Sequence, residues 1–228
     1  MDFAETEEQQ MIREMVREFA ETVAGPTCEK RDKEQIAPIK EFKKFAELGF
    51  AGMTIPEQYG GQKLDDISEA IVIEELSRVD PSLGVMVAVH VGLCSMTIAL
   101  SGNEAQKEKY LPKLASGEFL GAYSLSEAGS GTDAAAMVAK ATDDGDCYTL
   151  NGEKMWVTNG TTADLFVLFA KVTDHPDYGK KSHGGVTCFI IEKGFEGFQI
   201  GKKEDKLGIR SSDTCTLILN NCKVPKEN

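Results

Sequence analysis

The stretch YSLSEAGSGTDAAAM, residues 123–137, gathers small and hydroxyl-bearing residues between two apolar segments. Glycine has no Cβ, so Gly129 and Gly131 let backbone amides come close to a ligand. The serine and threonine hydroxyls of this stretch belong to Ser124, Ser126, Ser130 and Thr132. Such groups can hold the polar edge of a flat heteroaromatic ring, or an anion, without carrying a charge. A Ser/Gly turn capped by Asp133 has a similar composition, so the loop alone leaves both interpretations open.

Gly129, Gly131 and Ala134 also fit G-x-G-x-x-A, the pattern of a dinucleotide-binding turn. That fold needs a helix and a further parallel strand after the glycines. Residues 134–142 are too short for a crossover helix, and the sequence beyond them has the pattern of short strands. A P-loop is excluded because no Gly-Lys-Ser/Thr follows. The loop is therefore not a Rossmann turn.

A second stretch, NGEKMWVTNG at residues 151–160, contains the single tryptophan of the chain. Trp156 stands two positions before Thr158, and side chains at i and i+2 of an extended strand share a face. This spacing predicts an aromatic wall beside a hydroxyl. The alternative is a core tryptophan beside a hydrogen-bonded threonine, and this stretch alone does not decide between them.

The elements that must position these residues change type along the chain. In residues 1–118 apolar residues recur at helical spacing, and Thr6 with Gln9 predicts a capping box. Asn103 is expected to cap a further helix, which Pro112 should break or kink. Residues 81–103 contain no Asp, Glu, Lys or Arg and are long enough to span a bilayer. Their polar residues favour a helix buried in a bundle instead.

Residues 119–228 contain short β-branched or aromatic runs, at 164–172, 185–193 and 214–221. Asn-Gly pairs at 151–152 and 159–160 predict hairpin turns. The fold class expected is therefore an α+β multidomain protein. An N-terminal all-α helical bundle, residues 1–118, leads into an all-β barrel or sandwich, residues 119–228. The final residues, VPKEN, include no capping element, so we expect a further part to be missing.

The chain has a net charge of −12, with 22 acids against 13 bases in residues 1–120. Nucleic acid is not an expected partner, because its phosphates need a basic surface. Between residues 180 and 210 seven bases outnumber four acids: Lys180, Lys181, Lys193, Lys202, Lys203, Lys206 and Arg210. This basic stretch is either a solvated surface or a local attraction for a small anion.

The six cysteines form no C-x-x-C pair, and the polar first residues do not resemble a signal peptide. Reduced thiols and a cytoplasmic protein are expected. The three histidines lack the spacing of a ligand set, so no metal is predicted.

The segments YSLSEAGSGTD and GEKMWVTNG, behind an acidic helical region, together resemble the acyl-CoA dehydrogenase family. The segments GKKEDKLGIRSSDT and CKVPKEN are similar to its short-chain, butyryl-CoA-type members. The resemblance covers the whole chain and corresponds to the N-terminal helical and middle β domains, without the C-terminal helical domain. Ala128 stands where the family usually has proline, which should leave the loop less stiff. Thr132 stands where serine is common and keeps the hydroxyl.

The resemblance implies FAD as cofactor and acyl-CoA as substrate. The backbone and hydroxyls around Tyr123, Leu125 and Ser126 would bond the pyrimidine side of the flavin. Thr132 is included among the cofactor-binding residues and would also face the substrate, near the pantetheine or phosphate portion of CoA. The basic stretch, Lys180 and Lys181 above all, could assist in binding the anionic CoA.

The same resemblance places Trp156 against one face of the isoalloxazine ring. Val157 and Thr158 would continue that contact, with the Thr158 hydroxyl near flavin N5, where a donor stabilises developing charge. The family reaction is α,β-dehydrogenation: a carboxylate removes the α-proton while a hydride passes from the β-carbon to flavin N5. The reduced flavin is reoxidised by an electron-transferring flavoprotein.

The family's base is a glutamate of the C-terminal domain, so no catalytic residue is expected within this chain. Glu127 is not expected to replace that base, because its position belongs to the flavin loop and its turn. The chain alone should show weak or no activity, and a homotetramer or dimer is expected only with the C-terminal domain. Alternatives are a non-catalytic flavin- or acyl-CoA-binding or interaction module of the same fold, and an acyl-CoA oxidase-like flavoprotein. A eukaryotic source would place the protein in the mitochondrial matrix.

Overall fold

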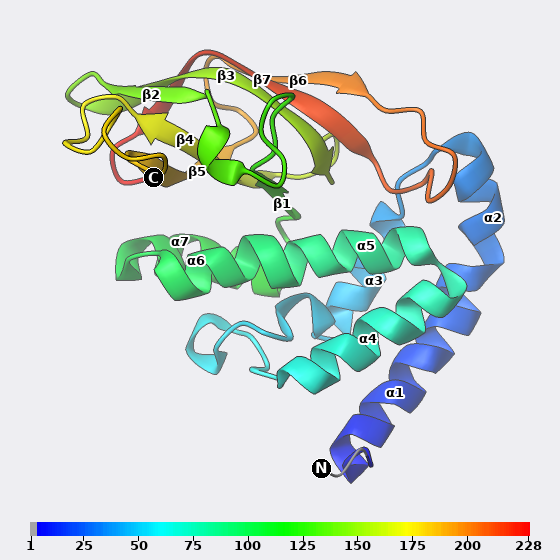
Figure 1. The fold of residues 1–228 in the computed structure, drawn as a ribbon. Helices are drawn as coiled ribbons and strands as arrows, with labels where there is room; N and C mark the ends of the chain where they lie inside the picture. The colour runs from blue at the N-terminus through cyan, green and yellow to red at the C-terminus, as the bar shows by residue number, and fades with distance from the viewer. Residues whose placement is uncertain (1–3) are drawn as a thin grey trace. The chain divides into compact units, whose positions relative to one another are not determined.

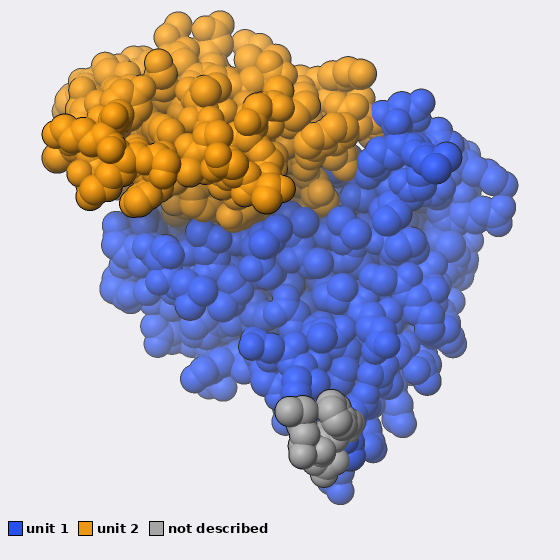
Figure 2. Space-filling model, viewed as in Figure 1, with its two compact units in different colours: residues 1–118, 205–213 blue, residues 119–204, 214–228 orange. Residues whose placement is uncertain are grey.

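In the computed structural model of the chain, residues 4–228 are described, and they divide into two compact units (Figures 1 and 2). The helical unit consists of the chain up to Glu118 together with Asp205–Asp213, and the β unit of Phe119–Glu204 with Thr214–Asn228. Residues 205–213 thus join the helical unit although they fall within the range expected for the β domain. A hydrogen bond within the helical unit holds them there: the backbone N–H of Arg210 donates to Asp32 Oδ1 at 2.7 Å.

The helical unit contains α1 (Glu7–Phe19), α2 (Gly25–Glu34), α3 (Ile39–Glu47), α4 (Asp66–Val79), α5 (Pro81–Ala88), α6 (Met96–Ser101) and α7 (Glu104–Ala115). Two π-helical segments, Ala20–Ala24 and Val89–Ser95, join α1 to α2 and α5 to α6. Two 3-10 turns lie at Phe50–Gly52 and Glu57–Tyr59. The predicted capping box of Thr6 and Gln9 is present, and Asn103 caps α7. Pro112 does not break α7, because the buried side chains of Leu111 and Leu114 hold the helix in the core.

The uncharged segment forms a continuous helical run, Pro81–Ser101, which is long and apolar enough to cross a membrane by length and composition. Half of its most apolar window is buried within the protein. His90 lies fully buried in this run, and its Nε2 is 3.1 Å from the carbonyl oxygen of Leu114 on α7. This packing supports the expected buried helix of a bundle.

The β unit contains β1 (Gly121–Ser124), β2 (Lys140–Asp143), β3 (Cys147–Thr158), β4 (Leu165–Val172), β5 (Val186–Glu192), β6 (Phe198–Lys203) and β7 (Thr214–Pro225). They form one seven-stranded sheet in the order β1-β4-β2-β3-β7-β6, with β5 on the other side of β4 (Figure 1). The β1–β4 and β2–β4 pairs are parallel and the others antiparallel. The Ile190 N–H on β5 donates to Asn228 O at 2.9 Å, so the sheet curls back on itself. The expected order of an all-α part followed by an all-β part is confirmed.

Both Asn-Gly hairpin predictions are wrong. Asn151 and Gly152 lie inside β3, where the register with β7 shifts between Leu150 and Gly152. A Cβ on Gly152 would come within 2.7 Å of the Ala139 Cβ, so this glycine permits a close approach between strands. Asn159 does turn the chain after β3, with φ 65°, but the next strand, β4, does not pair with β3. The antiparallel β2–β3 hairpin turns at residues 144–146 instead.

Candidate functional site

The glycine loop, residues 123–137, folds into a tight turn at its centre. The Glu127 N–H donates to Ser130 O at 2.8 Å, and the Ser130 N–H donates back to Glu127 O at 3.1 Å. The Ser130 hydroxyl donates to the carbonyl of Asp133 at 2.9 Å, just before a 3-10 turn at Ala134–Ala136. A Ser/Gly turn is therefore part of the correct description of this loop.

Only two of the four predicted hydroxyls are accessible. Ser124 and Ser130 are buried, and the Ser124 Oγ has no hydrogen-bond partner among residues 4–228. Ser126 is half-buried and Thr132 is exposed. Of the four hydroxyls that the loop offers, those of Ser124 and Ser130 are therefore withdrawn from solvent.

The two glycines of this loop have no internal reason to be glycine. A Cβ built on Gly129 or Gly131 meets no protein atom within 4 Å, and neither residue has a left-handed φ. By contrast, a Cβ on Gly61 would lie 1.9 Å from the carbonyl oxygen of Ile55. The space beside Gly129 and Gly131 is therefore open to a group from outside the chain, as the sequence predicts.

Trp156 is not a core residue, since 58% of its surface is exposed. It lies in a β-bulge of β3: Lys154 pairs with Leu217 and Val157 with Cys215, so β3 has one extra residue. Its φ of 59° is left-handed, a conformation that costs a residue with a side chain about 1–2 kcal/mol. An exposed, strained aromatic side chain points to function rather than to core packing.

The residues that follow Trp156 alternate between the core and the surface. Val157 is 1% exposed and belongs to the core of the β unit, whereas Thr158 is half-buried. Trp156 and Thr158 are therefore both more exposed than Val157 between them. Any contact of Val157 with a ligand would have to come from its backbone.

The structure brings the glycine loop and the tryptophan stretch together. The Met155 N–H donates to Ser126 O at 2.9 Å, and the Lys154 ammonium donates to Leu125 O at 2.9 Å. Tyr123 is half-buried and its ring lies 5.3 Å from that of Phe169. The two stretches that the sequence singles out therefore lie side by side.

Glu127 is fully engaged in structure. Its carboxylate accepts hydrogen bonds from the backbone N–H groups of Val138 at 2.6 Å and Ala139 at 3.1 Å. It also accepts one from the Lys154 ammonium at 2.7 Å. Only 6% of the residue is exposed. These bonds hold the carboxylate as part of the turn and leave it unsuited to act as a catalytic base.

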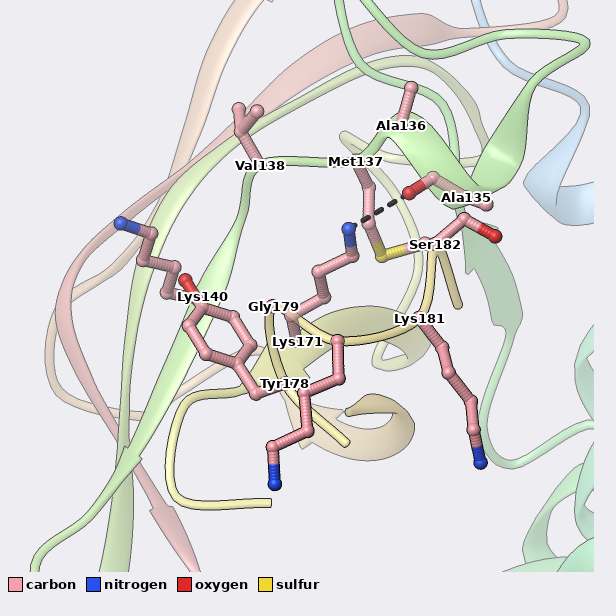
Figure 3. A pocket seen from close by; sticks show the side chains of 11 residues that line it. Ala135, Ala136, Met137, Val138, Lys140, Lys171, Tyr178, Gly179, Lys181 and Ser182 are labelled. Atoms are coloured by element: carbon pink, nitrogen blue, oxygen red, sulfur yellow. Dashed lines mark hydrogen bonds between the residues drawn. The ribbon is translucent and has the colours of Figure 1, made fainter. Parts of the chain in front are cut away.

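A pocket of about 580 Å³ lies next to the glycine loop in the β unit (Figure 3). Four of its lining residues are the lysines Lys140, Lys171, Lys180 and Lys181, with Tyr178 and Ser182 among the others. Lys171 donates to Ala135 O at 2.8 Å and Lys181 pairs with Asp177 at 2.9 Å, while Lys140 and Lys180 are exposed. This lysine pocket is a concentration of positive charge on a chain of net charge −12.

The basic residues between positions 180 and 210 are distributed over several elements. Lys180 and Lys181 line the pocket, Lys202 and Lys203 lie on β6, and Arg210 belongs to the helical unit. Sequence reasoning missed the two lysines that line the pocket together with Lys180 and Lys181. Lys140 and Lys171 are register partners across the parallel β2–β4 pair, and no local sequence signal indicates that pairing.

Comparisons with known proteins match both parts of the chain to one family. Residues 6–118 match the model of the acyl-CoA dehydrogenase N-terminal domain, and residues 122–222 match that of the middle domain. A short-chain specific acyl-CoA dehydrogenase of Clostridium acetobutylicum is 45% identical over 228 residues, which are 100% of this chain and 59% of that protein.

Three solved structures share the fold over nearly the whole chain. A chain in a structure of the electron transferring flavoprotein of Acidaminococcus fermentans has a TM-score of 0.94 at 46% identity, over 100% of this chain and 59% of that one. Butyryl-CoA dehydrogenase of Megasphaera elsdenii has a TM-score of 0.91 at 40% identity, over 100% and 59%. An acyl-CoA dehydrogenase of Bacillus anthracis complexed with FAD has a TM-score of 0.88 at 38% identity, over 98% and 37%.

Proposed function

The chain belongs to the acyl-CoA dehydrogenase family, and from this membership we propose that it is part of an FAD-dependent short-chain acyl-CoA dehydrogenase. It spans 59% of the length of the Clostridium relative, so the activity proposed is that of the whole protein. The reaction is the α,β-dehydrogenation of an acyl-CoA thioester. An electron-transferring flavoprotein is the proposed electron acceptor.

The observation that carries the proposal is the joining of the glycine loop to the bulge of Trp156. Ser126 and Met155 are linked by a backbone hydrogen bond of 2.9 Å, and Trp156 next to it is 58% exposed in a strained conformation. An open glycine backbone beside an exposed indole offers hydrogen bonds at the edge of a ring system and an apolar surface at its face. A flat, polar-edged heterocycle such as the isoalloxazine ring fits both.

The residues present fit FAD with a narrower set of contacts than the sequence suggests. Ser126 and Thr132 have accessible hydroxyls, and Gly129 and Gly131 leave open space beside the backbone. Trp156 would cover one ring face, with the half-buried Thr158 two positions further along β3. Bound FAD would supply the hydride acceptor. The chain's own residues would bind it, orient it and exclude water from one of its faces.

The lysine pocket supports a CoA thioester as substrate. Coenzyme A carries phosphates, and lysine ammonium groups are point-charge partners for them. Lys140 and Lys180 line the pocket and are exposed, and Lys181 is paired with one acid of the described chain, Asp177. We propose that this pocket holds the phosphate portion of the substrate against the general repulsion of an acidic chain.

We assign the catalytic base to sequence outside these 228 residues. The carboxylate of Glu127 already accepts from two backbone N–H groups and one buried ammonium. A base must be within hydrogen-bond reach of the proton that it removes, and the burial of Glu127 prevents that. Binding and orientation are the roles that we propose for the present chain.

The test is a visible spectrum of the purified chain titrated with FAD, followed by anaerobic addition of butyryl-CoA. We expect the flavin bands to shift on binding and to shift again, without bleaching, when the thioester is added. Bleaching would place a base within these residues and overturn that assignment. A chain that leaves the FAD spectrum unchanged, while folded by circular dichroism, would contradict the proposal that these residues suffice for a flavin surface.

A further inference from the structure

Glu127 and Lys154 form an ion pair that is withdrawn from solvent, with side chains 4% and 0% exposed. Burial lowers the pKa of the Lys154 ammonium, and the hydrogen bond and charge of Glu127 oppose that effect. Replacing a buried ion pair by apolar side chains of similar volume is often neutral or stabilising. The pair therefore needs a reason other than stability of the fold.

The directions of its hydrogen bonds supply that reason. The Lys154 ammonium on β3 donates to Glu127 at 2.7 Å and to the carbonyl of Leu125 at 2.9 Å. The Glu127 carboxylate accepts from the backbone of Val138 and Ala139, at the far end of the glycine loop. The pair thus ties both ends of the loop to one point on β3. Apolar side chains could fill the same volume, but they could not make these directional bonds.

That point on β3 lies next to Trp156. Lys154 is the last residue of β3 in register before the bulge, and Trp156 follows two positions later with φ 59°. Glu127 lies close to the open glycine backbone, because it begins the tight turn that contains Gly129 and ends at Ser130. The buried pair therefore connects the two segments proposed to contact the ring, beside the backbone hydrogen bond from Met155 to Ser126.

We propose that the Glu127–Lys154 pair is a positioning clamp, which holds the glycine loop at a fixed separation from Trp156 and so preforms the surface for a planar ring. Neither residue touches the ring itself. The identification of that ring as flavin rests on the proposed function, whereas the placement of Trp156 by the pair does not.

The chain provides its own probe, because Trp156 is its single tryptophan. Near-ultraviolet circular dichroism and acrylamide quenching of this residue report the position of the bulge without any ligand. The variants are Glu127→Gln, Lys154→Met and the double variant. The matched control is Lys223→Met, which removes an exposed ion pair of β7 with Asp144 and makes no contact with the loop. Far-ultraviolet circular dichroism establishes folding in each case.

We expect the single variants to be the less stable ones, since each leaves a buried partner without its counter-charge. The double variant leaves no unpaired charge and should unfold at a urea concentration close to that of the parent. Its Trp156 band in the near ultraviolet should nevertheless be lost or strongly reduced, and its quenching constant should rise about twofold. The control should keep the parent's values in every measurement.

A folded double variant with the parent's Trp156 band would overturn the clamp, because the bulge would then hold its place without the pair. A double variant that fails to fold would also overturn it, since the pair would then stabilise the unit as a whole. The ligand readout is the FAD dissociation constant, which we expect to rise at least tenfold in the double variant and to stay unchanged in Lys223→Met. If the parent binds no FAD, the proposal that these residues suffice for a flavin surface fails, while the Trp156 signal still decides the clamp.

Discussion

The buried histidine of the helical unit gives the protein a defined sensitivity to acid. His90 is completely buried on the helical run Pro81–Ser101, and its Nε2 faces the Leu114 carbonyl. Burial lowers the pKa of His90 from 6.5 to about 4, although hydrogen bonds to the backbone of Leu114 and Ala51 act in the other direction. The neutral imidazole is therefore the form that the folded state holds.

The direction of the change in stability with pH follows from which state, unfolded or folded, binds the proton first. As the pH falls through 6.5, the unfolded state takes up a proton that the folded state does not, so stability is lost from there down to about pH 4. At 1.36 kcal/mol for each pKa unit, the full loss is about 3 kcal/mol. About 2 kcal/mol of it falls between pH 8 and pH 5. Glu75, whose pKa Arg17 and other arginines lower to about 2, adds its own loss only below about pH 4.5.

The perturbation that tests this is His90→Gln, which removes the titrating group. Urea unfolding of parent and variant is followed at pH 8 and pH 5 by the helical circular dichroism signal. The parent should lose about 2 kcal/mol, or about 1 M in midpoint, relative to the change in the variant. A loss of stability that the substitution causes equally at both pH values does not affect this comparison. Equal pH dependence in both proteins would refute the reasoning, because the two backbone carbonyls would then hold the imidazolium as well as water does.

Two further predictions concern the β unit. Gly131→Ala should leave the free energy of unfolding unchanged or raise it by up to about 1 kcal/mol. The same substitution should weaken FAD binding at least tenfold. Unchanged FAD affinity would contradict the argument that the open glycine backbone receives the ligand. Lys180→Glu with Lys181→Glu should lower CoA affinity about tenfold at low salt, with the difference shrinking as salt rises. Lys202→Glu with Lys203→Glu on β6 is the control, and an equal loss there would show that general charge and not the lysine pocket is responsible.

Helix caps and strand runs were predictable because their causes are local. A threonine or asparagine side chain at a helix start bonds a backbone N–H three residues on, so Thr6 and Asn103 identify helix starts by themselves. The Asn-Gly pairs failed for the opposite reason. Whether Asn151–Gly152 turns the chain or continues it depends on β7 and on Ala139, which approach from elsewhere in the fold.

The sequence by itself determined the order of an all-α and an all-β part, the loop of glycines and hydroxyls, and the lone tryptophan beside a threonine. These depend on residue types and on spacings of a few positions. Only the tertiary structure decided that Ser124 and Ser130 turn inward, that Trp156 is exposed in a bulge, and that Lys140 and Lys171 join Lys180 and Lys181 at one pocket. The buried pair of Glu127 and Lys154 belongs to the same class. Such contacts join residues far apart in sequence, and the pairing of β strands that creates them is set by the packing of the whole sheet.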